Sequence, residues 1–325
     1  MAPTVSGASL RGRSLGELLA CTSLLLYSVN SLITKVGVGR VSVNVGFMVA
    51  VAVNILFAAL LLAGQLLLQA TPLVWNWPGF FFFVLAGICT TLFGRFFYYE
   101  AVANFGPARA SVYQLAIPVF SAALAALFLG ERLGPLTLLG GLITMLGLFI
   151  AVYVPGSFRS ATTAPRRVVT GSLYKRILMS SATTLCLTGS FSYGVGNLMR
   201  GAAVQRWDEP VLGALVGAGA ALLALILSSA DARRALTEIG AANRTGVLLF
   251  VVNGTLNISA QMTGIMALRY IEVAVASLIA SCVPILVIPL SWLFLRRQEH
   301  LSLRLLAGAL VATGGVALIV FGRRL

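Results

Sequence analysis

The segment PARASVYQLAIP at residues 107–118 decides the fold, because a related segment, VAVASLIASCVP, occupies residues 273–284. Both segments carry an Ala-X-Ala-Ser motif, and each ends in a proline seven residues after its serine. Further on, Glu131, Gly140 and Gly147 of the first copy correspond to Glu299, Gly308 and Gly315 of the second. The similarity extends over residues 94–154 and 260–322, so the chain contains two related halves.

The composition places both halves in a membrane. Of the 325 residues, 59% are hydrophobic and only 10% are charged, and the mean hydropathy is +0.97. A soluble domain has about 25% charged residues. Apolar runs of roughly 18 or more residues are typical of membrane-spanning helices. An internal repeat in such a chain indicates a transporter whose substrate site lies between two related halves near the bilayer midplane.

The net charge of +14 would suit a nucleic-acid partner, but the basic residues are scattered over short loops and the termini. They form no dense cluster and are not interleaved with aromatic residues, so we expect contacts with the lipid bilayer and no nucleic-acid binding. The cysteines fall within predicted spans without metal-ligand spacing. Because no nucleophile–base–acid set or phosphate loop is visible either, we expect no catalytic residue, no metal and no cofactor.

Ten membrane-spanning helices are predicted, in two sets of five. The first set is 16–36, 43–69, 79–103, 107–129 and 134–154, and the second is 177–199, 210–229, 245–268, 273–295 and 301–322. The polar segment 155–176 is a predicted linker, which separates a first five-helix repeat at 1–154 from a second at 177–325. Lipid cannot satisfy unpaired backbone groups, so each span must be helical.

An odd number of spans in each half inverts the second half relative to the first, which creates a pseudo-two-fold axis in the membrane plane. The predicted fold is therefore an all-α integral membrane protein made of two inverted five-helix repeats. Gly140 and Gly147 are seven residues apart and share a helix face, as do Gly308 and Gly315. These glycines predict close helix packing in a scaffold.

Three amides of the eighth span, Asn253, Asn257 and Gln261, recur every four residues and so share one face. They are predicted to line a substrate cavity, and hydrogen bonding between helices is the alternative. Tyr27 and Asn30 in the first span, Gln114 in the fourth, and Tyr193 and Asn197 in the sixth are further candidates for substrate binding. For these residues, core packing with satisfied polar groups is the alternative.

Arg95 lies deep in the third span, at the repeat position that corresponds to Gln261. An arginine at such a depth is paired or functional, and its guanidinium suits an anionic or zwitterionic substrate. The alternative is a structural ion pair with another helix, since Glu100 lies on a different face of the same span. Glu100 itself is a candidate proton carrier, with solvation at the membrane interface as its alternative. Neither role is decided by the sequence.

Pro118 and Pro284 fall inside the fourth and ninth spans. Proline removes a helical hydrogen bond and kinks a helix. Matched kinks in matched helices predict hinges for gating, with bending for packing as the alternative.

The motifs FFYYEA at 96–101, GPARAS at 106–111 and LGERL at 129–133 resemble the EamA domain of the drug/metabolite transporter superfamily. The second copy is a looser match, with RRQEH at 296–300 where the first half has LGER. The resemblance covers nearly the whole chain. It implies ten helices and a secondary transporter, but no particular substrate, because relatives carry amino acids, sugar nucleotides, triose phosphates, cationic drugs or lipid-linked sugars.

The distribution of charge and the family resemblance predict opposite membrane orientations. The segments on the linker side hold fourteen Lys and Arg residues and those on the side of the termini hold eight, which would place the linker in the cytoplasm. The resemblance implies that both termini are cytoplasmic. We prefer the second orientation, because charges in long loops count for less.

The sequence thus predicts a multi-pass protein of the bacterial inner membrane that exports a small polar metabolite, amino-acid-like or anionic, by alternating access. A lipid-linked sugar flippase, a drug/proton antiporter and a non-transporting scaffold are the alternatives. The first span has no acid in its interior, since Glu17 lies at its start, which argues against the antiporter. A homodimer is left open.

Overall fold

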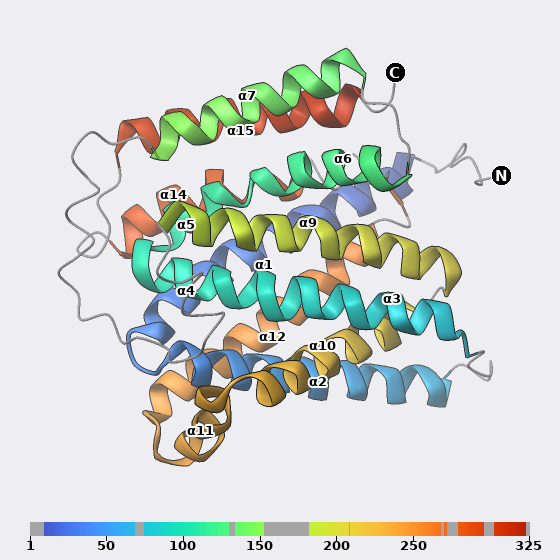
Figure 1. Ribbon diagram of the computed structural model, residues 1–325, viewed down its shortest axis with the longest axis vertical. Helices are drawn as coiled ribbons and strands as arrows, with labels where there is room; N and C mark the ends of the chain where they lie inside the picture. Colours follow the sequence, from blue (N-terminus) through green and yellow to red (C-terminus); the bar gives the residue numbers. More distant parts are fainter. Residues whose placement is uncertain are drawn as a thin grey trace.

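Every element in the described part of the chain is a helix in the computed structural model (Figure 1). The described residues are 10–68, 75–129, 134–152, 182–207, 209–267, 270–271, 279–295 and 302–322. The predicted linker 155–176 and the paired residues Glu131 and Glu299 lie outside these ranges.

The helices of the first half are α1 (Leu10–Val38), α2 (Val43–Leu68), α3 (Trp77–Gly87), η1 (Ile88–Arg95), α4 (Phe96–Phe105), α5 (Pro107–Tyr113), α6 (Ala116–Leu129) and α7 (Pro135–Val152). Those of the second half are α9 (Ala182–Arg206), α10 (Pro210–Ser228), α11 (Ala230–Glu238), η3 (Ile239–Ala241), α12 (Arg244–Ala267), α14 (Val283–Phe294) and α15 (Leu303–Gly322). Each predicted span overlaps at least one of these helices.

Six helical segments of the described chain are long and apolar enough to cross a membrane. They are Ser14–Val38, Val43–Leu68, Trp77–Asn104, Pro107–Phe128, Val211–Ser228 and Leu303–Phe321. The helices α7 and α14 are apolar but shorter, and α12 meets the test only together with the preceding segment Ala230–Ala241, from which it is bent by 115°. The chain is therefore a multi-pass, all-helical membrane protein.

The short helix α11 was not predicted. Ser229 caps it by accepting a hydrogen bond from the backbone N–H of Ala232 (3.3 Å), and its sequence, ADARRALTE, is too polar for a span. On one side of α11, Ala232 and Ala235 are buried against the rest of the protein. A nine-residue charged segment between two apolar runs gives no span signal, which is why the sequence suggested a loop there.

The predicted break between the third and fourth spans is confirmed at Gly106. This glycine has a φ of 84°, the left-handed region that other residues avoid, and it separates α4 from α5. Pro107 then begins α5, where its missing N–H leaves no helical hydrogen bond unmade.

The two halves interlock, and their contacts are matched. The first helix of one half packs on the third spanning segment of the other: α1 contacts α12, and α9 contacts α3 and η1. In the same way α2 contacts α12 while α10 contacts α3, and α6 contacts α9 while α1 contacts α14. Exchanging the halves reproduces the contact pattern, as expected for repeats related by a pseudo-two-fold axis.

The helices α7 and α15 lie side by side at one edge of the bundle (Figure 1). A Cβ on Gly140 would stand 2.6 Å from the backbone oxygen of Gly315. A Cβ on Gly147 would stand 2.3 Å from the backbone nitrogen of Ala312. The predicted close packing through these glycines is confirmed, since no side chain larger than hydrogen fits at either position.

The fourth and ninth predicted spans are each interrupted by a turn shortly before Pro118 and Pro284. Gln114 and Leu115 form a turn between α5 and α6, and Ser281 and Cys282 form the equivalent turn before α14. The carbonyl of Gln114 accepts from the N–H of Ile117 (3.0 Å), because Pro118 has no N–H to offer to it. Both helices are therefore interrupted where the prolines predicted a disturbance; the kink angle and a role in gating stay predictions.

Candidate functional site

Arg95 stands at the end of the only π-helical segment in the described chain. The segment η1, Ile88–Arg95, interrupts an otherwise continuous helix from Trp77 to Phe105. Short π-helical turns within α-helices are frequent at functional sites, because the wider turn re-aims side chains. Arg95 is only 4% exposed, which confirms that its guanidinium lies inside the bundle.

A buried asparagine of α2 holds Arg95 in place. With its amide oriented so that all its polar contacts are satisfied, the Oδ1 of Asn54 accepts from Nη1 of Arg95 (2.6 Å) and from Nδ2 of Asn257 (3.2 Å). Its Nδ2 donates to the backbone oxygens of Gly254 (2.8 Å) and Ala50 (3.2 Å). Asn54 thus joins Arg95 to α12 through neutral groups.

The helix α9 presents Tyr193 and Arg200 to the π-helical segment. Tyr193 packs against Gly94, where a Cβ would come within 2.8 Å of its ring. About two turns further on, Arg200 donates from Nη2 to the hydroxyl of Thr90 (3.2 Å). The predicted sixth span ends at residue 199 and so leaves out Arg200; this boundary is wrong, because α9 continues to Arg206 and Arg200 is partly buried.

These residues form one electrostatic group. Tyr27 and Tyr193 both lie within electrostatic range of the guanidiniums of Arg95 and Arg200. The 166 residues that separate Arg95 from its repeat partner Gln261 also separate Tyr27 from Tyr193. The two tyrosines are thus repeat partners, and the structure brings them to the same pair of cations.

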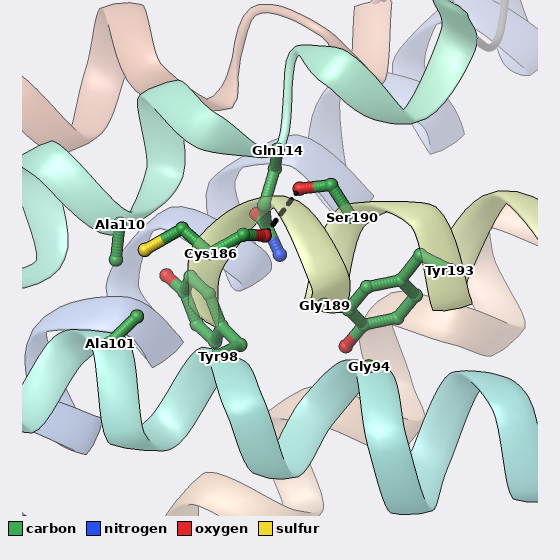
Figure 2. A pocket seen from close by; sticks show the side chains of 9 residues that line it. All are labelled: Gly94, Tyr98, Ala101, Ala110, Gln114, Cys186, Gly189, Ser190 and Tyr193. Carbon is green, nitrogen blue, oxygen red and sulfur yellow. Dashed lines mark hydrogen bonds between the residues drawn. The ribbon is translucent and has the colours of Figure 1, made fainter. Parts of the chain in front are cut away.

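A small pocket opens beside this group (Figure 2). It is lined by Gly94, Tyr98, Ala101, Ala110, Gln114, Cys186, Gly189, Ser190 and Tyr193. Gln114 comes from the turn between α5 and α6, and its side chain reaches toward α9 in Figure 2. Its open volume is about 10 Å³, roughly the room that one water molecule needs. A larger ligand could enter only if the surrounding helices moved apart.

The neighbouring hydroxyls are already bonded. Ser190 donates to the backbone oxygens of Tyr113 (2.9 Å) and Cys186 (3.1 Å), and Tyr98 donates to Ser31 (2.7 Å). These bonds connect the pocket wall to α1, α5 and α9. They fix the shape of the pocket, so that Gln114 and Tyr193 are its predicted binding residues.

Asn253 is placed differently from the other two amides of α12. It is fully buried; its Oδ1 accepts from the hydroxyl of Tyr99 and its Nδ2 donates to that of Thr34 (2.8 Å). Both ends of the amide are used between helices, which favours the packing alternative over cavity lining. Asn257 faces Asn54 and Arg95, whereas Gln261 is partly exposed and makes no hydrogen bond within the described chain.

Substituting Asn253 with alanine is expected to lower the free energy of unfolding by about 1 kcal/mol, because the Tyr99 and Thr34 hydroxyls each lose a partner. Ligand affinity per folded molecule should not change. Thermal unfolding together with ligand titration of the purified variant would check both, with Tyr99→Phe as the control that removes one bond only. A loss of affinity without a loss of stability would return Asn253 to the substrate site.

Asn30 and Asn197 differ in burial. Asn30 is 6% exposed, and its Oδ1 has no hydrogen-bond partner in the described chain. Such an orphaned acceptor costs free energy unless a ligand or water meets it. Asn197 is exposed and shares no described hydrogen bond with the residues around Arg95. The structure therefore groups Asn30, and not Asn197, with the buried polar residues.

Glu100 is 8% exposed, so it does not lie in the solvated interface that we gave as the alternative. Nδ2 of Asn104 donates to its backbone oxygen (2.7 Å) and approaches its Oε2 (3.5 Å). Lys35 donates to the nearby backbone oxygens of Val102 (3.3 Å) and Ala103 (3.0 Å) at the end of α4. Within the described residues Glu100 forms no ion pair with Arg95.

Comparison with models of protein families shows which family this chain belongs to. The model of the EamA-like transporter family matches this chain twice, over residues 14–153 and 180–321. The chain belongs to the EamA-like transporter family. No curated protein sequence matches it. A solved structure titled only "Crystal structure of protein" is similar over 96% of this chain and 100% of the other, with 18% identity and a TM-score of 0.48.

Two residues of this EamA-family site were missed from the sequence. Asn54 is an amide in the second span, where the neighbouring amides, Asn44 and Gln65, are ten and eleven residues away and gave no short-range helical pattern. Arg200 was missed because the predicted end of its helix was too early. The repeat offered a signal, since Thr34 is buried and lies 166 residues before Arg200, the same separation as between Arg95 and Gln261. A polar residue buried in one half is a reason to inspect its counterpart in the other.

Proposed function

We propose that this EamA-family protein is a secondary transporter that moves a small anionic or amino-acid-like metabolite by alternating access. The observation that carries the proposal is Arg95, a buried arginine whose described partners are the neutral side chains of Asn54 and Tyr193. A charge buried without a counter-ion is costly. An anionic group on the substrate would offset that cost at the centre of the bundle.

The proposed substrate site comprises Tyr27, Asn30, Arg95, Gln114, Tyr193 and Asn257. Gln114 and Tyr193 line the pocket, while Arg95 and Tyr27 belong to the charged group beside it. The amide donors and acceptors would orient the polar part of the substrate. A cationic drug would meet two arginines there, which speaks against the antiporter alternative.

The matched contacts between the halves support ten spanning segments in two inverted repeats. In this arrangement α7, α9, α12 and α14 cross the membrane although they are short or carry polar residues. The helix α9, at 25 residues, is long enough to cross, and its polar face carries Tyr193 and Arg200. We keep export as the direction, with the termini in the cytoplasm, on the analogy of bacterial relatives.

Pro118 and Pro284 are proposed as hinges of the fourth and ninth spans. Pro118→Ala and Pro284→Ala restore a backbone donor in each bent helix and should stiffen it. We expect turnover to fall by about tenfold while ligand affinity stays within about twofold, since gating and not binding would be affected. Transport rates and equilibrium binding of the same preparations check this. A parallel loss of both would indicate that the bends only serve packing.

Transport into liposomes tests the proposed function. The purified full-length protein, reconstituted and preloaded with amino acids, dicarboxylates or phosphate esters, should exchange at least one class with labelled solute outside. Glu100→Gln should abolish stimulation by an imposed pH gradient if Glu100 carries protons, and should leave gradient-free exchange intact. Absence of exchange for every class would contradict the transporter proposal.

A further inference from the structure

The faces of η1 and α9 bring a second arginine to Arg95. In a π-helix the hydrogen bonds join residues five apart, so Thr90 and Arg95 lie on adjacent turns of one face. In α9, Tyr193 and Arg200 are seven apart and share a face as well. Arg200 bonds Thr90 (3.2 Å) and Tyr193 packs on Gly94, so the two faces are in register and both arginines lie along one seam.

Glycines allow this close approach. A Cβ on Gly196 would stand 2.3 Å from Cγ2 of Thr90, and one on Gly94 would stand 2.8 Å from the ring of Tyr193. The helices therefore meet near van der Waals contact along this seam. Two like charges are held together here by backbone packing.

No carboxylate neutralises the pair within the described chain. The contacts of Arg95 are to Asn54 and Tyr193, and Arg200 bonds Thr90; all three partners are uncharged. An ion pair joins Arg234 to Asp231 in α11, far along the chain from both arginines. Glu100, the buried acid of the same span as Arg95, interacts with Asn104.

We infer that Arg95 and Arg200 together bind a small dianion, a phosphate ester or a dicarboxylate. One anionic group would leave either the buried Arg95 or the partly buried Arg200 without a counter-ion, whereas two negative charges on one molecule offset both. Guanidinium forks suit phosphate and carboxylate oxygens equally, and the hydroxyls of Tyr27 and Tyr193 add neutral donors. This inference rests on the proposed transport function and specifies its substrate class.

Binding to the purified full-length protein tests the pair. The probes are glycerol 3-phosphate against glycerol, and succinate against its monomethyl ester, at mildly alkaline pH where both dianions are fully charged. The wild type should bind at least one dianion about tenfold or more tightly than its less charged counterpart. The probe pair that shows the preference distinguishes phosphate esters from dicarboxylates.

Variants of Arg200 test whether this residue causes the preference for the dianion over its less charged counterpart. Arg200→Gln should lower dianion affinity about tenfold or more and reduce the preference to within about threefold, while the less charged probe binds as before. Arg200→Lys retains the charge and should keep most of the preference, even if Arg200→Gln folds poorly. The matched control is Arg206→Gln, since Arg206 is exposed on the same helix and lies over Phe82; it should bind as the wild type does.

Two results would overturn the inference: equal binding of dianion and counterpart by the wild type, or an equal loss of both probes in Arg200→Gln. Exchange in liposomes separates this outcome from failure of the proposed function. If amino acids exchange without any dianion preference, the protein is a transporter and the two-arginine site is wrong. If dianions bind through Arg200 but no solute crosses, the site stands and transport is wrong.

Discussion

Replacement of Arg95 by glutamine is expected to lower the affinity for an anionic substrate by at least about 100-fold. A guanidinium can form two hydrogen bonds to an anionic group, each contributing about 1.5–3 kcal/mol, and about 1.4 kcal/mol corresponds to a tenfold change. Glutamine cannot replace that charge. Titration of wild-type and variant proteins with the anion that the wild type exchanges measures the effect directly.

The same substitution should leave the thermal stability of the ligand-free protein unchanged or raise it. Asn54 keeps Asn257 as a donor after Arg95 is removed, and the cost of burying an unneutralised cation disappears. A residue that lowers stability but supports binding is typical of functional sites. If Arg95→Gln instead unfolds the protein and the folded fraction binds normally, Arg95 is a structural residue. Arg244→Gln, at an exposed helix start, is the control for loss of one positive charge.

Alanine in place of Gly147 is expected to lower the free energy of unfolding by about 1–3 kcal/mol, the usual cost of forcing extra volume into a packed interface. Its Cβ would lie 2.3 Å from the backbone nitrogen and 2.7 Å from Cα of Ala312, so α15 must move as a whole. Gly315→Ala should act similarly, since its Cβ would meet the backbone nitrogen of Thr144 at 2.4 Å.

Neighbouring glycines provide matched controls for the packing of α7 on α15. Gly314 has no atom within 4 Å of a built Cβ, and the nearest atom to that of Gly141 is Cγ1 of Val119 at 3.9 Å. Alanine at either position should be neutral or stabilise the helix by up to about 1 kcal/mol. Thermal unfolding in one detergent compares the four variants. Equal effects at Gly314 and Gly315 would contradict the close helix contact.

The scaffold was predictable because it is duplicated. Gly140 and Gly147 recur as Gly308 and Gly315, and spacing alone indicated which face they share. The helix interruptions before Pro118 and Pro284 followed from the missing N–H of proline. Each of these features depends on local chemistry, which a sequence shows directly.

The site was only partly predictable, because its partners come from different helices. The depth of Arg95 could be read from its span, but the bond to Asn54 depends on how α2 packs. The amides of α2 are ten and eleven residues apart and gave no short-range pattern. For α12 the sequence predicted too many site residues. Three amides share one face of this helix, yet the amide of Asn253 is already hydrogen-bonded to Tyr99 and Thr34. The position of Arg200 depended on about two further turns of α9 beyond the predicted end of the span.

Anion exchange by reconstituted wild type and Arg95→Gln proteins tests the central claim most directly. Equal amounts of each, with Arg244→Gln as the charge control, would be assayed for exchange of an anionic metabolite across liposome membranes. We predict exchange by the wild type and by Arg244→Gln, and a rate indistinguishable from protein-free liposomes for Arg95→Gln. Unchanged exchange by Arg95→Gln would contradict a substrate site built around this arginine.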